Sequence, residues 1–228
     1  MILLMVKKIN FYKFDIDDSV YKRLINTKVV GLDTETTGLY MPPARLCLVQ
    51  LYFPELDEVH MVHFPMTNAQ ELYSNSQNLT KLLSQKSLLK IIHYARFDCL
   101  SIKKYLHIMM ENVVCTKIMS QVCRTYTDKH GLKDLVKTIL NKNIDKGQQT
   151  SDWGQGQLTE PQMEYAAQDV IYLNDLYIKL KEICIRENRY ELVCRLFNCI
   201  TPFVMAEYES FCPDKIMNPF KYRQFDKS

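Results

Sequence analysis

Long hydrophobic runs and paired cysteines are both missing from this 228-residue sequence. The apolar stretch MILLMV at the N-terminus is too short for a signal-peptide core or a membrane-spanning helix, and Lys7 and Lys8 end it. We therefore expect an edge strand in this stretch, no membrane partner and a cytoplasmic location. The eight cysteines stand singly, without a CxxC pair, which argues against a zinc site and indicates reduced thiols in the core.

A large excess of charge of either sign is also lacking. Lysine and arginine number 29 against 26 acidic residues, which gives a formal net charge of +3. Proteins that hold long RNA through many phosphates usually carry a larger basic excess, so this balance favours a short substrate. We find no internal repeat and no low-complexity segment, and 47% hydrophobic residues predict one globular domain over residues 1–210. Residues 211–228, with two prolines, are expected to form an extended tail.

The hydrophobic pattern predicts an α/β fold. Apolar runs at 29–32, 46–53 and 59–64, joined by short connections, indicate an antiparallel meander. Helically spaced leucines within 68–86 lead to another apolar run at 88–93, which indicates a crossover to a parallel strand. Helices are expected at 96–105, from Thr159 onward and from 190 to 209. Thr159 with Glu160, Pro161 and Gln162 matches a capping box with an early proline.

Acidic residues follow these elements in a pattern that predicts chemistry. Asp33 and Glu35 are two apart on an expected strand and so project from one face. Asp98 falls in the first turn of the helix at 96–105, near the sheet edge where the other acids emerge. Tyr165 and Asp169 are four apart on an expected helix and are therefore neighbours.

Four converging carboxylates repel one another, and two divalent cations about 3.5–4 Å apart are a common way to relieve that repulsion in nucleases. We therefore predict a two-metal phosphodiesterase centre that uses Mg²⁺ or Mn²⁺. Asp33 would bridge both ions, Glu35 and Asp169 would hold one of them, and Asp98 would act on the second. Tyr165 would orient or deprotonate the attacking water.

The segments GLDTETTGL, HYARFDCL and EYAAQDV resemble the three motifs of the DEDDy 3′–5′ exonucleases at Asp33, Glu35, Asp98, Tyr165 and Asp169. The resemblance implies a ribonuclease H-like (DnaQ-like) fold with a mixed sheet of five to six strands flanked by helices. The segment from KGQQTSDW to YAAQDVIYL is similar to ribonuclease D. CTKIMSQVCRTYTDKHGLKDL, from Cys115 to Leu135, also resembles nanoRNase C, the short stand-alone branch.

This resemblance implies a homo-octameric exoribonuclease that cuts diribonucleotides into nucleoside 5′-monophosphates at the end of RNA decay. Activity on longer RNA or DNA is also associated with the family. Leu39 matches the position of an apolar wedge between the two bases, with a core leucine as the alternative. His93 matches a histidine that contacts sugar or phosphate, with a core histidine as the alternative. Thr36, beside the acidic pair, is also assigned to substrate binding.

A dinucleotide enzyme must recognise the 5′ phosphate of its substrate, because capping that end excludes longer chains. Lys146, Gln149 and Ser151 are our preferred candidates, with Arg124 and Lys129 as second choices; a solvated basic loop is the alternative. Trp153, the only tryptophan, either stacks on a base or anchors its loop.

Two other functions stay open from the sequence. One is a broader 3′–5′ exonuclease, either a ribonuclease D-like RNA trimmer or a DNA end-processing enzyme, since the same metal centre serves both sugars. The other is a catalytically inactive binding module, which has no reason to retain all five motif residues.

Overall fold

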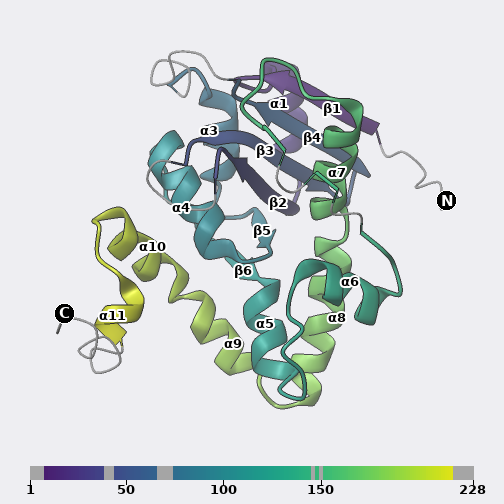
Figure 1. Ribbon diagram of the computed structural model, residues 1–228, viewed down its shortest axis with the longest axis vertical. Helices are drawn as coiled ribbons and strands as arrows, with labels where there is room; N and C mark the ends of the chain where they lie inside the picture. The colour runs from purple at the N-terminus through teal and green to yellow at the C-terminus, as the bar shows by residue number, and fades with distance from the viewer. Residues whose placement is uncertain (1–7, 39–43, 66–73, 145–146, 149–150, 218–228) are drawn as a thin grey trace.

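One six-stranded sheet organises the chain (Figure 1), and the computed structural model describes residues 8–38, 44–65, 74–144, 147–148 and 151–217. The strands are β1 (Lys8–Lys13), β2 (Val29–Thr36), β3 (Leu46–Phe53), β4 (Glu58–His63), β5 (Leu89–Ile92) and β6 (Val113–Cys115). Their order is β1-β4-β3-β2-β5-β6. Strands β2, β3 and β4 form the expected antiparallel meander, and β5 joins β2 in parallel as the crossover predicted. Strand β1 pairs in parallel with β4, and β6 with β5.

Helices cover both faces of this sheet. The helices of the described residues are α1 (Asp18–Leu24), α3 (Gln77–Leu83), α4 (Ala95–Leu106), α5 (Thr116–Cys123), α6 (Leu132–Leu140), α7 (Glu160–Ile171), α8 (Leu173–Arg186), α9 (Tyr190–Phe197), α10 (Ile200–Tyr208) and α11 (Pro213–Met217). One core packs α1, α3, α4 and α10 against the sheet, and a second packs α7 and the start of α8 against the opposite face. A third cluster joins α5, α6, α8 and α9. The mixed α/β prediction is confirmed.

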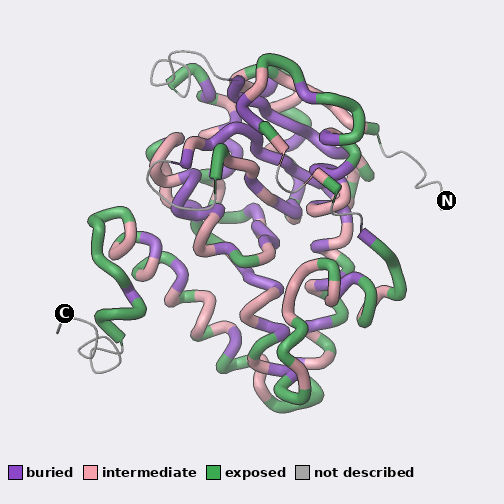
Figure 2. The backbone as a smooth tube through the Cα atoms, in the orientation of Figure 1, coloured by how far each residue is buried: buried purple, intermediate pink, exposed green. Residues whose placement is uncertain are grey.

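Strand β3 lies at the centre of both cores. All eight of its residues are buried, which explains why LCLVQLYF reads as an almost continuous apolar run rather than as an alternation (Figure 2). Strand β2 alternates instead: Val30 and Leu32 enter the first core, whereas Asp33 and Glu35 point to the face that α7 covers. The acids therefore emerge beside an apolar layer without being part of it.

Helix α7 approaches β2 at a glycine. A Cβ atom at Gly31 would lie 2.7 Å from the main-chain oxygen of Val170, closer than van der Waals contact allows. The absence of a side chain at residue 31 lets the helix that carries Asp169 pack directly over the strand that carries Asp33.

Two expectations need correction. Residues 190–209 form two helices, α9 and α10, because Pro202 near the start of α10 has no N–H to continue the hydrogen bonding from α9. Residues 213–217 are the short helix α11 within the segment expected to be extended. The edge strand expected in MILLMV lies outside the described residues, and strand β1, at 8–13, forms one edge of the sheet. The domain boundary near residue 210 stays a prediction.

In the described part of the chain, no helix combines the length and the hydropathy needed to span a bilayer.

Candidate metal centre

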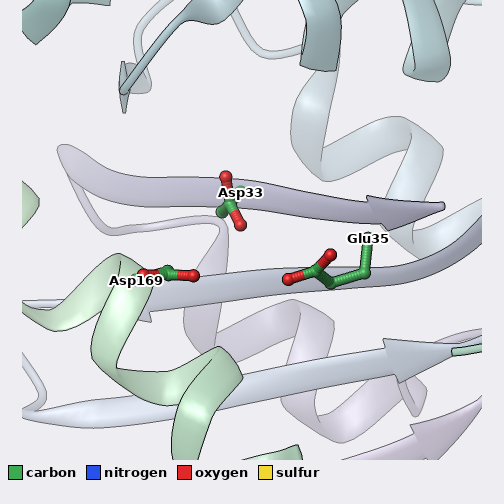
Figure 3. A group of neighbouring side chains, drawn as sticks. All are labelled: Asp33, Glu35 and Asp169. Atoms are coloured by element: carbon green, nitrogen blue, oxygen red, sulfur yellow. The ribbon is translucent and has the colours of Figure 1, made fainter. Parts of the chain in front are cut away.

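Three carboxylates meet where β2 passes under α7. One ligand oxygen from each of Asp33, Glu35 and Asp169 lies within 4.8 Å of the other two. Figure 3 shows the three groups turned toward one another, with Asp169 projecting from the helix. This spacing suits carboxylates that share cations, because each oxygen can reach an ion placed among them.

Local sequence explains how each carboxylate reaches this point. Asp33 and Glu35 alternate with Thr34 along β2, so both fall on the α7 face of the strand. Helix α7 begins with the predicted capping box: the Thr159 hydroxyl accepts from the Gln162 N–H, and the Gln162 side chain accepts from the Thr159 N–H. This cap determines where the helix starts and thereby where Tyr165 and Asp169 lie along it.

Asp98 is held by a residue on the opposite face of β2 from Asp33 and Glu35. It lies in the first turn of α4, as predicted, and is 2% exposed. The Thr34 hydroxyl, from the residue between the two acids of β2, donates a hydrogen bond to its Oδ1 at 2.7 Å. The structure thus brings all four predicted carboxylates to one stretch of β2, three on one face and Asp98 through the intervening residue.

The carboxylates resist ionisation in this arrangement. Burial, with repulsion from neighbouring carboxylates, raises the pKa of Asp33 and of Glu35 well above their ordinary values. Burial also raises the pKa of Asp98 to about 7, against the opposing effect of its bond from Thr34. A set of oxygen donors that holds this much unfavourable negative charge fits hard divalent cations such as Mg²⁺ or Mn²⁺.

Tyr165 faces the same site from α7. It is 7% exposed, and burial together with its carboxylate neighbours raises its pKa above the ordinary range for tyrosine. Its hydroxyl is hydrogen-bonded to Asp169. The hydroxyl therefore lies among the carboxylates, and both roles predicted for it, orienting or deprotonating the attacking water, stay predictions.

Trp153 belongs to the layer under α7. The side chain is 2% exposed, its ring centroid lies 5.9 Å from that of Tyr165, and its main-chain oxygen is 3.1 Å from Nε2 of His63. The indole thus packs in the layer beneath α7, and the choice between stacking on a base and anchoring the loop stays a prediction.

The remaining residues that we predicted to bind substrate differ in how deeply they are buried. His93 is half-buried, with Nδ1 2.9 Å from the Thr116 hydroxyl. Arg124 is 4% exposed, and its guanidinium donates to the main-chain oxygen of Lys129, whose side chain is exposed, and to the Thr138 hydroxyl of α6. Ser151 accepts a bond from Gln162 and donates to the main chain of Gln148.

Thr36 ends β2, and its hydroxyl donates to the main-chain oxygen of Gly38. Leu39, Lys146 and Gln149 lie outside the described residues. The substrate-binding assignments of all these residues stay predictions.

Sequence reasoning missed one residue next to the carboxylates and two at the ends of neighbouring strands. Gln50 is the one strongly polar residue in the apolar run of β3, a signal that was available, and it pairs directly with Asp33. Tyr94 and Lys117 follow the carboxyl ends of β5 and β6, and the Lys117 ammonium lies 4.1 Å from the centroid of the Tyr94 ring. Tyr94 is 50% exposed, with a left-handed backbone (φ 67°) that is unusual for a bulky residue.

Comparison with known sequences gives a consistent result. The family model described as "3'-5' exonuclease" matches residues 13–185. Ribonuclease D of Gluconacetobacter diazotrophicus is 34% identical over 176 residues, which are 76% of this chain and 42% of that protein. DNA polymerase I of Aquifex aeolicus is 32% identical over 162 residues, or 71% of this chain and 25% of that protein. The chain spans only about a quarter to two fifths of these curated relatives.

Solved structures of similar length also match. Brucella melitensis NrnC superposes with a TM-score of 0.78 at 32% identity, covering 98% of this chain and 100% of that one. Further structures of that protein are described as bound to pGG (TM-score 0.77, 32% identity, 98% and 100% covered) and with bound Mg²⁺ (0.76, 31%, 97% and 100%). These matches confirm the resemblance to nanoRNase C and ribonuclease D and the ribonuclease H-like fold.

Proposed function

This chain belongs to the 3′–5′ exonuclease family, and from that premise we propose that it hydrolyses short RNA from the 3′ end, with diribonucleotides preferred, to nucleoside 5′-monophosphates. The observation that carries the proposal is the convergence of Asp33, Glu35 and Asp169 within 4.8 Å, with Asp98 held behind them by Thr34. Retention of every motif residue in one site argues against an inactive binding module.

The residues of the site would have separate roles in hydrolysis. Asp33, Glu35 and Asp169 would hold two divalent cations, and Asp98 would support the second of these. When bound, such cations activate water, stabilise charge on the phosphoryl oxygens and assist the departing 3′ oxygen. Tyr165, protonated and hydrogen-bonded to Asp169, would orient the attacking water with its hydroxyl. The stoichiometry of two ions is part of the proposal.

Preference for dinucleotides is supported by two observations. The chain matches Brucella melitensis NrnC over nearly its whole length, and a structure of that protein is described as bound to pGG. The formal charge of +3 also suits a substrate with few phosphates better than a long RNA. A role at the end of RNA decay, a homo-octameric assembly and a cytoplasmic location belong to the same proposal through the resemblance to nanoRNase C.

Tyr94 and Lys117 are further groups that this edge of the sheet offers to a nucleic acid. The Lys117 ammonium covers one side of an aromatic ring that is half exposed, and it forms no ion pair with any described residue. We infer that the ring supports a nucleobase while the ammonium attracts a phosphate, as in other single-strand sites.

A broader exonuclease is the alternative, and the match to DNA polymerase I of Aquifex aeolicus is the observation that favours it. The deciding experiment offers 5′-labelled RNAs of two, three, five and ten nucleotides, and DNAs of the same lengths, to the purified chain in Mg²⁺ or Mn²⁺. We expect the RNA dinucleotide to disappear much faster than the longer substrates. Similar rates at all lengths would favour the broader exonuclease.

The matched control for this assay is Asp33→Asn, which keeps the shape of the side chain and removes its charge. We expect no turnover from this variant. Full activity of Asp33→Asn would contradict the metal centre itself, and binding without turnover by the unaltered chain would favour the inactive module. Light scattering of the same preparation tests the octamer independently.

A further inference from the structure

A glutamine lies inside the sheet beside the metal centre, with no hydrogen-bond partner for its amide. Gln50 is 0% exposed, and neither its Oε1 nor its Nε2 is hydrogen-bonded. A buried amide without partners is costly, and an apolar side chain of similar volume would fill this strand position without that cost. Packing alone therefore does not account for glutamine at this position, and unpaired polar groups of this kind point to a functional partner.

The strand register shows which side of the sheet the amide faces. Gln50 of β3 pairs directly with Asp33 of β2 on one side and with Met61 of β4 on the other. Residues paired in this way project from the same face of a sheet, with Cβ atoms about 4.5–5.5 Å apart. Met61 lies in the core that α7 covers, so the Gln50 side chain lies in that layer next to Asp33.

Gln50 is not the only unpaired polar group in this layer. Nδ1 of His63 and Nε1 of Trp153 are also buried and without partners. In the neighbouring row, His63 pairs with Leu48, which pairs with Glu35, so a core residue separates this histidine from the acid. Gln50 is therefore the polar residue that pairs directly with an acid of β2, in a layer that is otherwise largely apolar.

We propose that Gln50 is a positioning residue of the metal centre: when cations bind, its free amide N–H donates to the Asp33 carboxylate and holds it in the orientation that binds them. Among the side chains directly paired with Gln50, the Asp33 carboxylate is the strong acceptor, because the only other one is the Met61 thioether. A donor to a ligating carboxylate restricts its rotation and offsets part of its negative charge. This role rests on the proposed metal-dependent function and adds a residue to it.

The test is Gln50→Met, which keeps the length of the side chain and removes the amide. Mg²⁺ affinity is measured calorimetrically without substrate, and kcat and KM are measured at saturating Mg²⁺. We expect Mg²⁺ affinity and kcat each to fall about 10- to 100-fold, with KM for the dinucleotide unchanged. Thermal unfolding in EDTA should show no loss of stability, because the variant removes an unpaired buried amide. Unchanged Mg²⁺ affinity in a folded variant would overturn the proposal.

Gln85→Met is the matched control. The Gln85 side chain has its own buried, unpaired oxygen just beyond α3, outside the metal centre, and its replacement should leave Mg²⁺ affinity and kcat unchanged. The unaltered chain separates the two proposals. If it neither binds Mg²⁺ nor cleaves RNA, the proposed function fails, whereas normal behaviour of both the unaltered chain and Gln50→Met rejects only the role of Gln50.

A second measurement needs no variant and therefore does not depend on how Gln50→Met folds. In a crystal structure of the full chain grown with Mg²⁺, we expect Nε2 of Gln50 within about 3.2 Å of an Asp33 oxygen. An amide turned away from Asp33 in that structure would overturn the proposal whatever the variant does.

Discussion

The Thr34 hydroxyl donates a hydrogen bond of 2.7 Å to Asp98. This bond connects β2, which carries two of the acids, to α4, which carries a third. Both residues are almost fully buried, with Thr34 6% and Asp98 2% exposed. The bond lies on the other face of β2 from Asp33 and Glu35, because Thr34 points to the opposite face from these two acids. Asp98 therefore depends on a single residue of β2 for its orientation relative to the other three carboxylates.

Replacement of Thr34 by valine tests this dependence. Valine has nearly the same shape, so the variant removes the donor while it preserves the packing. We expect the free energy of unfolding to fall by about 1–3 kcal/mol and kcat to fall about tenfold or more. Denaturant unfolding and steady-state kinetics in Mg²⁺ measure the two effects. Thr34→Ser keeps the hydroxyl and should retain most of the activity; equal losses in both variants would show that packing, not the hydrogen bond, matters.

Binding of Mg²⁺ should depend on pH because the carboxylates hold protons without it. Burial raises the pKa of Asp98 to about 7 from an ordinary value of 3.8, and the pKa of Asp33 and of Glu35 is also raised. The stabilising contribution of the Asp98 carboxyl to the metal-free protein is therefore lost as pH rises from about 4 through 7, where the folded carboxyl ionises beside its neighbours. If Mg²⁺ must displace the proton of Asp98, its apparent affinity weakens about tenfold per unit of pH below 7.

The measurement is the increase in unfolding temperature caused by Mg²⁺ over EDTA, taken from pH 6 to pH 8. We expect this increase to grow with pH. We compare Mg²⁺ with EDTA because burial also lowers the pKa of His60 to about 4. This shift makes stability rise between pH 4 and 6.5, and in EDTA alone it would mask the opposite effect of the carboxylates. Asp98→Asn removes one of the displaced protons and should flatten the dependence. An increase that is the same at pH 6 and pH 8 would contradict this account.

The acids themselves were predictable because local rules place them. Alternation along a strand puts Asp33 and Glu35 on one face, and a capping box begins the helix that carries Tyr165 and Asp169. Each of these rules depends only on residues close in sequence. The first turn of α4 places Asp98 in the same way, so the three segments could be assigned to elements before any long-range contact was known.

Long-range register was not predictable, and the missed residues depend on it. Gln50 is next to Asp33 only because β3 pairs with β2 in one particular register, which a shift by a single residue would change. The same limit applies to Trp153, for which the sequence allowed both an exposed and a buried ring. Its burial depends on how its loop packs against β4, which is far away in sequence, and against α7. Local sequence rules do not determine either contact.

Gly31 offers a test of how closely α7 must approach β2. In Gly31→Ala the new Cβ would lie 2.7 Å from the main-chain oxygen of Val170, so the helix has to move away. We expect a loss of about 1–3 kcal/mol in the free energy of unfolding, and a fall of up to about 100-fold in kcat because Asp169 moves with the helix. Gly156→Ala is the control, since its Cβ would meet nothing within 4 Å. Unchanged kcat in Gly31→Ala would show that the site tolerates this displacement.

Tyr94 and Lys117 provide the last test, which concerns substrate binding rather than the metal centre. Tyr94→Asn removes the ring, and asparagine readily adopts the left-handed conformation that residue 94 has, so the backbone is preserved. Stacking on an aromatic ring contributes about 1–3 kcal/mol per base, and we therefore expect KM for short RNA to rise about 5- to 150-fold. The value of kcat and the Mg²⁺ affinity should change little, because neither residue is part of the acidic cluster.

Lys117→Glu should also raise KM, and most strongly at low salt, where an unscreened carboxylate repels the phosphates of the substrate. Tyr208→Asn is the matched control, since its ring is 40% exposed and also lies beside a lysine ammonium, that of Lys103, but belongs to α10 and to no predicted binding segment. Steady-state kinetics on the dinucleotide at two salt concentrations measures all three variants. If KM is unchanged in both Tyr94→Asn and Lys117→Glu, the cation over the ring serves only to hold α5 against the start of α4, and the substrate takes another path to the carboxylates.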